Sequence, residues 1–204
     1  MKIIGICGGS GSGKTSIIRD IRRQFNEDQL CIISQDEYYR KREEQIRDEK
    51  GIQNFDLPYA IRSEEMIADI SKLREGEKVS RIEYTYNNEL KDPQTVFYQP
   101  APVLIIEGLF IFHFEEIREM CDLKIFVHAE KKLMLDRRIK RDRTERNYPL
   151  EDVLYRFEHH VLPAFKKYIK PYKKESDLVI VNNTRYDPGL NVLCGYIRDF
   201  LSKN

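Results

Sequence analysis

Short apolar runs alternate along this chain with longer segments in which apolar residues recur every three or four positions. The runs hold four to six residues and predict buried strands at 2–7, 30–34, 103–106, 123–127 and 178–181. The periodic segments predict amphipathic helices at 16–25, 63–75, 131–146, 150–169 and 187–201. Strands that are separated by helices in this way usually pair as a parallel sheet with helices on both faces.

Two segments depart from this alternation. Residues 79–86 alternate in the manner of an exposed strand, and with 95–98 they predict a small β-ribbon inserted at about 78–99. Residues 37–62 are polar, and Gly51 and Pro58 interrupt them, so we expect a functional loop or a frayed helix there. The 204 residues are therefore expected to form a single three-layer α/β domain over 1–204, with five parallel strands.

A glycine-rich loop connects the first expected strand to the first expected helix. Residues 8–15 read GGSGSGKT and match the pattern G-x-x-x-x-G-K-[ST]. Glycines permit positive φ and bring backbone N–H groups close to an anion, and the following helix adds unpaired N–H groups of its own. A glycine-rich turn that binds nothing would seldom have both flanks, so the sequence predicts a P-loop NTPase-type fold that binds a nucleoside triphosphate.

The P-loop residues have distinct expected roles. Lys14 can reach the β- and γ-phosphates, and the Thr15 hydroxyl can bind Mg²⁺. Lys14 is also a catalytic candidate, because it places positive charge where the transferred group concentrates negative charge. The expected nucleotide-binding residues are Gly8, Gly9, Ser10, Gly11, Ser12, Gly13, Lys14, Thr15 and Ser16.

Two acidic residues follow later strands. In open parallel sheets, ligands bind beyond the carboxyl ends of the strands, and Asp36 and Glu107 occupy such ends. Asp36 could accept the proton of an attacking hydroxyl group or hold Mg²⁺ through water. Glu107 is placed like a Walker B acid, which orients the magnesium shell. The alternatives are a helix cap or loop aspartate at 36 and a solvated strand end at 107.

A strongly basic stretch, RRIKRDRTER at 137–146, has too few apolar residues for a well-buried helix. Its simplest interpretation is a solvated helix face. In a chain with a P-loop, a mobile arginine lid at about 137–148 fits better, because arginine meets phosphoryl groups with planar, bidentate donors.

Charge and cysteine content exclude several other classes. The net charge of +1 gives no reason to expect nucleic-acid or membrane binding, and no apolar run approaches the length of a membrane span. The first strand follows Met1 directly, so no signal peptide is expected. Four scattered cysteines without a C-x-x-C pair, and histidines without metal-ligand spacing, indicate neither a disulfide framework nor a zinc site. We therefore expect a cytoplasmic protein.

Tyrosines form two close pairs, Tyr38 with Tyr39 in the loop and Tyr84 with Tyr86 in the ribbon. Aromatic residues on a ribbon commonly serve packing. A planar base also needs an aromatic face on which to stack, so these tyrosines are candidates for a substrate pocket.

Taken together, these segments resemble the uridine kinase family of P-loop nucleoside kinases over nearly the whole chain. The resemblance rests on the order and spacing of the P-loop, SQDEYYR at 34–40, NFDLP at 54–58, IEG at 106–108, RDRTER at 141–146, PAF at 163–165 and PYKK at 171–174. It implies phosphorylation of the 5′-hydroxyl of uridine or cytidine by ATP or GTP with Mg²⁺, and often a homotetramer.

The resemblance also implies roles for individual residues. Asp36 would be the general base, and Thr15 and Glu107 would serve Mg²⁺ beside it. The other candidates are Asp56 and Arg138 for the ribose, Tyr84 and Tyr86 together with Tyr38 for the base side, and Arg141 and Arg146 for closing on the phosphates.

The chain departs from the family pattern in the segments that select the acceptor. Glu89 stands where the ribbon commonly has histidine, and Asn147 and Tyr148 replace a glycine and an arginine at the end of the lid. The 54–58 segment also lacks the usual histidine before proline. Phosphoryl transfer should survive these changes, whereas nucleoside selectivity depends on hydrogen bonds to the base edge, where one lost partner has a strong effect.

Two other functions therefore stay open. One is a P-loop kinase of another small hydroxyl substrate, such as nicotinamide riboside, pantothenate or phosphoribulose, although the aromatic ribbon weakly favours a planar base. The other is a non-catalytic nucleotide-binding module or switch. Against a guanine-nucleotide switch, the chain has no Asn-Lys-x-Asp base reader, and its D-x-x-G match at 48–51 follows no strand.

Overall fold

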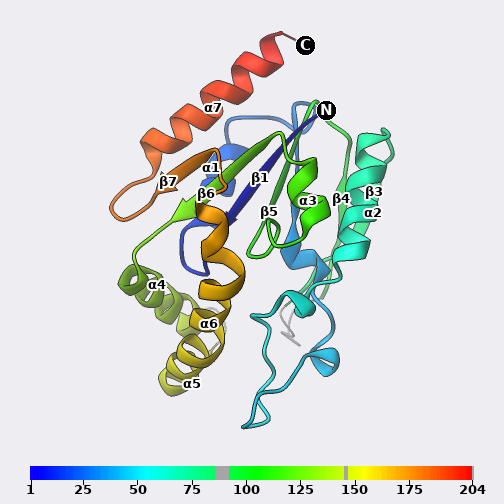
Figure 1. The fold of residues 1–204 in the computed structure, drawn as a ribbon. Coiled ribbons are helices and arrows are strands. Elements are labelled where there is room, and N and C mark those ends of the chain that lie inside the picture. Colours follow the sequence, from blue (N-terminus) through cyan, green and yellow to red (C-terminus); the bar gives the residue numbers. More distant parts are fainter. Residues whose placement is uncertain (86–91, 145–146, 204) are drawn as a thin grey trace.

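The central sheet has five parallel strands in the order β2-β5-β1-β6-β7. They are seen in the computed structural model, which describes residues 1–85, 92–144 and 147–203 (Figure 1). The strands predicted from the apolar runs are confirmed, and their bounds are Lys2–Gly8 (β1), Leu30–Ser34 (β2), Val103–Gly108 (β5), Leu123–His128 (β6) and Leu178–Val181 (β7).

The register of the sheet brings the carboxyl ends of three strands to one edge. Cys7 pairs with Gly108 between β1 and β5, and Ser34 pairs with Glu107 between β2 and β5. The P-loop, Asp36 and Glu107 therefore share the rim at which parallel sheets bind ligands. The two chain termini lie at the other end of the molecule (Figure 1).

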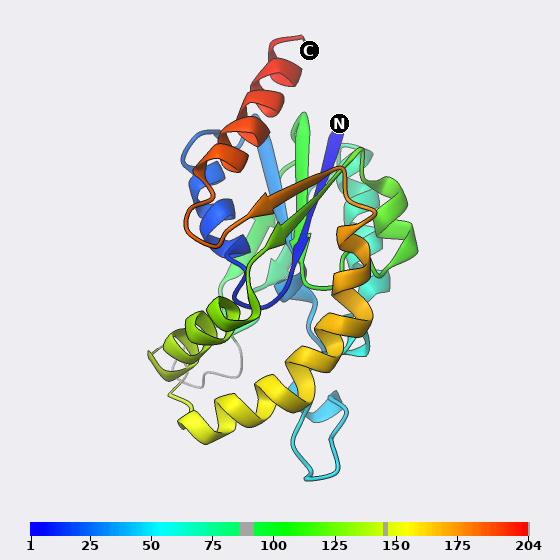
Figure 2. The ribbon, with the colours of Figure 1, turned by 60° about the vertical axis from the view of Figure 1, so that its left-hand side comes forward.

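Each face of the sheet buries its own core, because successive side chains of a strand point to opposite faces. Helices α1 (Lys14–Arg22) and α7 (Asp187–Ser202) cover one face, where they bury Ile17, Ile21, Leu193 and Ile197 against strand residues such as Ile4 and Ile105. Helices α2 (Ser63–Arg74) and α3 (Glu115–Met120) cover the other face (Figures 1 and 2). The predicted three-layer architecture is confirmed.

The predicted β-ribbon is also present beside the main sheet. Strands β3 (Val79–Ile82) and β4 (Thr95–Tyr98) pair antiparallel, so that Val79 lies opposite Tyr98. Both of these residues are buried in the core under α2. The turn of the ribbon, which includes Tyr86 and Glu89, lies outside the described residues.

The loop between β2 and α2 contains short helical turns at Gln35–Tyr38, Arg42–Glu44 and Pro58–Ala60. Helix α2 begins at Ser63, as the sequence predicts, and Arg62 occupies its N-cap position. The loop thus has more local structure than an irregular segment, although it keeps no helix longer than four residues.

The helical region that follows the basic stretch is less regular than its sequence predicts. After α4 (Lys131–Thr144), the chain forms α5 (Leu150–Arg156), a π-helical segment Phe157–Val161, the short α6 (Leu162–Ala164), a second π-helical segment Phe165–Ile169 and a 3-10 turn Lys170–Lys173. Proline has no N–H to donate to the preceding turn, so wider turns on either side of Pro163 are a natural consequence.

Helices α4, α5 and α6 extend past the carboxyl edge of the sheet, opposite the loop between β2 and α2 (Figure 2). Among the described residues, no helix combines the length and the apolar character that crossing a bilayer requires. The four cysteines are free thiols buried within the fold.

Candidate functional site

The P-loop turns from β1 into α1 through glycines that no other residue could replace without strain. Gly11 and Gly13 have φ angles of 80° and 101°, a region that side chains rarely adopt. A Cβ at Gly13 would also collide with the amide of Asn182, and one at Gly11 would collide with the backbone of Met134. The loop is therefore shaped by its glycines and by close contact with neighbouring elements.

Lys14 bends back over this loop. Its Nζ donates a hydrogen bond to the carbonyl oxygen of Gly8 at 2.9 Å. Thr15, the next residue, is exposed in the first turn of α1. The first turn of a helix presents unpaired N–H groups to an anion, so Lys14 and the loop form a positively charged site suited to a phosphate group.

The acids at the ends of β2 and β5 are joined by Ser34. Its Oγ donates to Glu107 Oε1 at 2.6 Å and accepts the backbone N–H of Asp36 at 3.3 Å. Ser34 is the N-cap of the turn Gln35–Tyr38, so Asp36 lies in the first turn and is not the cap. Both carboxylates consequently stand beside the P-loop on one rim.

The pKa of Glu107 is raised, first because the carboxyl group is buried and second because of the negative charge of Asp36. Lys14 and the Ser34 hydroxyl act against this rise but do not cancel it. A cation bound between Asp36 and Glu107 would offset their repulsion and favour the charged form of Glu107.

The donor set fits Mg²⁺ better than a metal held by protein alone. Within 1–85, 92–144 and 147–203, no three His, Cys, Asp or Glu side chains form a metal-binding group. Magnesium commonly takes one or two carboxylates and fills its remaining positions with water and phosphate oxygens. The residues that could hold it are Thr15, Asp36 and Glu107.

Basic helix α4 lies directly against the P-loop. Arg137 donates to the carbonyl oxygens of Gly11 and Asn182 at 3.4 and 3.0 Å, and Arg138 donates to Ser10 Oγ at 3.1 Å. The arginines nearest the loop therefore contact its backbone and its serine in this structure. Arg146, which was expected to close on the phosphates, lies outside the described residues.

One ion-pair network makes this helix more buried than its sequence suggests. Arg138 and Asp142 are only 7% and 1% exposed. Asp142 lies 3.0 Å from Arg138 Nε and accepts a hydrogen bond from Arg141 Nε at 2.9 Å. The rest of the described stretch fits the expectation of a poorly buried helix, since Lys140, Arg143 and Thr144 are exposed. Arg138 and Asp142 are the exceptions, because paired charges can be buried where single charges cannot.

Arg138 also connects the P-loop to the loop between β2 and α2. Its NH1 lies 3.8 Å from Asp56 Oδ1 while bonding to Ser10. Arg138 therefore lies within reach of both Ser10 and Asp56. A small polyol could form hydrogen bonds with both Arg138 and Asp56.

Aromatic rings line the same side. Tyr39 stacks on Tyr84 with ring centroids 5.2 Å apart, and it meets the edge of Phe55 at 6.2 Å. The backbone N–H of Tyr84 donates to Glu37 Oε2 at 2.8 Å, which fixes the end of the ribbon beside the turn that carries Asp36. This cluster could stack a planar base. Tyr86, its other candidate, is not among the described residues.

The expectation for Tyr38 is corrected by its position. It is 1% exposed, its hydroxyl donates to Asp69 at 3.1 Å, and the Arg81 guanidinium lies 4.2 Å from its ring centre. Tyr38 thus packs against α2, whereas its neighbour Tyr39 is the one in the aromatic cluster. The sequence could not distinguish two adjacent tyrosines that point to different sides of the chain.

Asn182 was missed by sequence reasoning. It is 5% exposed, its Nδ2 donates to the Ser12 carbonyl at 2.9 Å, and its N–H donates to the His128 carbonyl at 2.7 Å. It follows β7 directly, so the rule that strand ends meet at one rim could have identified it. Phe55 was missed as well, and only its place in the NFDLP segment pointed to it.

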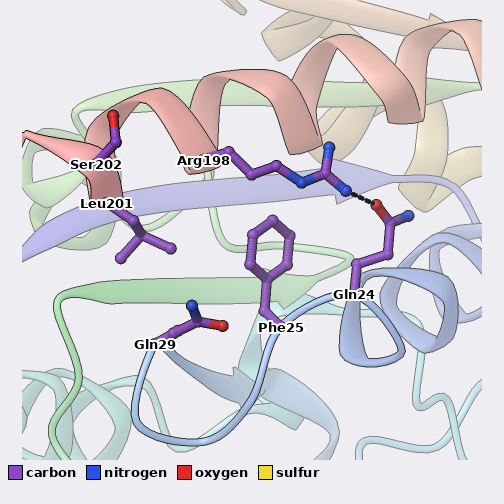
Figure 3. Close-up of a pocket in the computed structure, with 6 residues that line it drawn as sticks. All are labelled: Gln24, Phe25, Gln29, Arg198, Leu201 and Ser202. Atoms are coloured by element: carbon purple, nitrogen blue, oxygen red, sulfur yellow. Dashed lines mark hydrogen bonds between the residues drawn. The ribbon is translucent and has the colours of Figure 1, made fainter.

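A separate hollow of about 360 Å³ lies between the end of α7 and the segment that joins α1 to β2 (Figure 3). The Arg198 side chain points toward Gln24 there and lies over Phe25. Gln29, which also lines it, immediately precedes the amino end of β2, so this hollow is at the edge of the sheet opposite the P-loop. It takes no part in the candidate site.

Comparison with known proteins identifies the family. The model of the phosphoribulokinase / uridine kinase family matches residues 3–187. A uridine kinase of Staphylococcus haemolyticus is 31% identical over 201 residues, which cover 98% of this chain and 97% of the relative. A uridine kinase of Brevibacillus brevis is 32% identical over 178 residues, with 87% and 83% covered.

Solved structures share the fold at lower identity. A possible uridine kinase from Bacillus stearothermophilus superposes with a TM-score of 0.59 and 18% identity, covering 87% of each chain. The phosphoribulokinase from Rhodobacter spheroides has a TM-score of 0.59 and 19% identity, with 90% of this chain and 72% of that chain covered. The P-loop, the acids on the same rim and these relationships lead to one conclusion: the chain belongs to the phosphoribulokinase / uridine kinase family of P-loop kinases.

Proposed function

We propose that this kinase phosphorylates the 5′-hydroxyl of a pyrimidine ribonucleoside, uridine or cytidine, at the expense of ATP or GTP. The observation that carries the proposal is the position of Arg138, which contacts Ser10 of the P-loop at 3.1 Å and lies 3.8 Å from Asp56. A substrate that forms hydrogen bonds with Arg138 and Asp56 would be held within reach of both the phosphates and the acids of the rim.

The nucleotide with Mg²⁺ would supply the transferable phosphoryl group, and the P-loop, Thr15, Glu107 and Asp36 are the residues that would hold it. Lys14 neutralises negative charge that concentrates on the transferred group. Asp36 accepts the proton of the acceptor hydroxyl, and it needs only correct placement because positioning contributes most of the rate in such reactions. Arg141 and Arg146 would close over the phosphates.

Acceptor binding would use the opposite wall of the site. Asp56 accepts hydrogen bonds from ribose hydroxyls, and Arg138 donates to them from the other side. The base stacks on the aromatic cluster through Tyr84, with Tyr86 as a further candidate. The homotetramer, the cytoplasmic location and the single domain stay predictions from the sequence.

The decisive experiment is a coupled phosphoryl-transfer assay with both ATP and GTP across a panel of acceptors. The panel contains uridine, cytidine, nicotinamide riboside, pantothenate and ribulose 5-phosphate. We expect turnover of uridine or cytidine to exceed that of the others. Good turnover of another acceptor would overturn the substrate, and nucleotide hydrolysis that no acceptor changes would favour a non-kinase module.

The second candidate is a kinase of another small hydroxyl substrate. The fold is shared with phosphoribulokinase, and a D-glycerate 3-kinase from Cryptococcus neoformans also superposes, with a TM-score of 0.58. The aromatic cluster of Tyr39, Phe55 and Tyr84 favours the nucleoside, since a sugar phosphate or glycerate has no planar base to stack on it.

A further inference from the structure

A cluster of three side chains outside the phosphate site joins the loop between β2 and α2 to the helical region after the basic helix. Asp48 comes from the loop, Tyr155 comes from α5, and His160 comes from the π-helical segment Phe157–Val161. None of these residues touches the P-loop in the contacts described above. They link the two segments through the carboxylate of Asp48.

Asp48 first shapes its own segment into a hairpin. Its Oδ1 accepts the backbone N–H groups of Lys50 and Ile52, both at 2.9 Å. Gly51 allows the turn with a φ of 77°, and the N–H of Asn54 donates to the Ile46 carbonyl at 2.7 Å. The D-x-x-G match at 48–51 is therefore the signature of this turn and not of a nucleotide switch.

The other oxygen of the same carboxylate docks the hairpin. Asp48 Oδ2 accepts a hydrogen bond from His160 Nε2 at 2.7 Å and one from the Tyr155 hydroxyl at 3.0 Å. The imidazole must donate here, because a carboxylate can only accept. His160 is 2% exposed, so water competes poorly for this bond.

The carboxylate is held in its charged form. Partial burial would raise the pKa of Asp48, but the hydrogen bonds from Ile52, His160, Tyr155 and Lys50 outweigh burial and hold that pKa well below its usual range. A hydrogen bond to a charged group is stronger than one between neutral groups. The carboxylate of Asp48 therefore anchors the hairpin to the helical region with two hydrogen bonds, one of them buried.

Asp56 follows Asp48 by eight residues in the chain, and hydrogen bonds hold the segment between them in place. Arg156 NH1 donates to the Gln53 carbonyl at 3.1 Å, and Asn54 Oδ1 accepts the backbone N–H of Asp56 at 2.9 Å. Asp56 then lies 3.8 Å from Arg138. Undocking the hairpin would let Asp56 move away from Arg138.

We propose that Asp48, Tyr155 and His160 are positioning residues that act through Asp56, and that they set the affinity for the acceptor without touching it. The inference rests on the proposed function in one respect, the identity of Asp56 as a residue that meets the acceptor. The contact joins two segments that are distant in the sequence.

The test compares variants that remove the docking bonds with matched controls. His160→Phe removes one donor and keeps a ring, Tyr155→Phe removes the other donor, and Asp48→Ala removes every bond of the carboxylate. Glu49→Ala and Glu158→Ala change exposed acids of the same hairpin and the same helical turn. Steady-state kinetics with the best nucleoside acceptor and with ATP are measured for each protein.

We expect the acceptor KM to rise by roughly 10- to 100-fold in His160→Phe and Asp48→Ala, the scale on which small misplacements act. The value of kcat and the KM for ATP should change by less than about threefold, and the controls should match wild type. His160→Gln, which keeps a side-chain N–H donor, should recover part of the loss. If the three residues only stabilised the fold, their loss would lower kcat and the kcat/KM values for the acceptor and for ATP together. It would not raise the acceptor KM alone.

Hydrogen exchange separates this proposal from the proposed function. In His160→Phe, backbone amides of 46–56 should exchange faster while those of the sheet do not, whichever acceptor the enzyme uses. If wild type phosphorylates no nucleoside, the proposed function fails, and faster exchange in 46–56 still supports the docking. Unchanged exchange in this segment, or an unchanged acceptor KM in both His160→Phe and Tyr155→Phe, would overturn the inference.

Discussion

The nucleotide side and the acceptor side of the site are built in different ways. The centre of the nucleotide side is one continuous segment, from Gly8 to Ser16, whose glycines and backbone N–H groups form the phosphate cradle. The acceptor side assembles from the loop at 37–62, the end of the ribbon and two helices, and it depends on side-chain pairs. His160 and Asp48, for example, are separated by 112 positions.

This difference explains which part tolerates change. A backbone cradle depends on φ angles that glycine supplies locally, so its form is preserved wherever the motif is. A wall of paired side chains can exchange one partner at a time, and each exchange alters what it accepts. The nucleotide side should therefore give the largest effects on rate, and the acceptor side should give effects on affinity.

The strongest test of the nucleotide side is Lys14→Ala. Removing a charge that stabilises the transferred group in a water-poor site should lower transfer by roughly 10²- to 10³-fold or more. Arg19→Ala, on an exposed position of the same helix, should leave activity near wild type. Activity of Lys14→Ala within tenfold of wild type, with an unchanged circular dichroism spectrum, would contradict the assigned role.

Asp36→Asn tests the rim between the two sides. It keeps the shape of the side chain and removes the base, so kcat should fall by roughly two to four orders of magnitude with the nucleoside Kd nearly unchanged. Asp28→Asn provides an exposed control just before β2. A near-normal kcat in Asp36→Asn would show that Asp36 is not the general base and that another group accepts the proton.

Glu107→Gln should lower activity while raising the stability of the nucleotide-free protein at neutral pH. Loss of the carboxylate should lower activity by roughly 10- to 100-fold, as for other residues that orient a metal shell. The Ser34 hydroxyl can still donate to the amide oxygen, so the local hydrogen bond is kept.

The stability effect has the opposite sign and depends on pH. Because the pKa of Glu107 is raised in the folded state, the folded protein binds its proton more tightly than the unfolded chain does. The stability that this gives is present at low pH and is lost as pH rises through the folded-state pKa. The Tm of the nucleotide-free Glu107→Gln protein should therefore exceed that of wild type at neutral pH, by more than at acid pH. An equal difference at both pH values would contradict this.

The smallest effect is expected for hydrogen exchange in the basic helix α4, which lies between the nucleotide side and the acceptor side. If the lid closes on the phosphates, amides at 137–144 should exchange more slowly with ATP and Mg²⁺ than without them. Arg138, already paired with Asp142, should change least because it is buried in the nucleotide-free form. Equal and strong protection with and without ATP and Mg²⁺ would show that this stretch is a structural helix and not a lid.

Much of the fold followed from local patterns. The strands, the ribbon and most of the helical segments came from apolar periodicity, because a parallel sheet that is covered on both faces needs uniformly apolar strands. Helix α3 (Glu115–Met120) was not predicted. The π-helical turns at 157–169 were not predicted, since Pro163 indicates that the helix is interrupted but not how far the wider turns extend on either side of it.

The sequence by itself determined the P-loop and the two acids on its rim, since a glycine motif and strand-end acids act through local backbone geometry. Only the tertiary structure showed that Tyr38 is buried while Tyr39 stacks on Tyr84, that Asp142 lets Arg138 be buried, and that His160 holds the loop of Asp48. A single side chain carries no sign of its partner when that partner is far along the chain. Buried charge pairs and docked loops can therefore be identified only in the folded structure, where the two partners lie in contact.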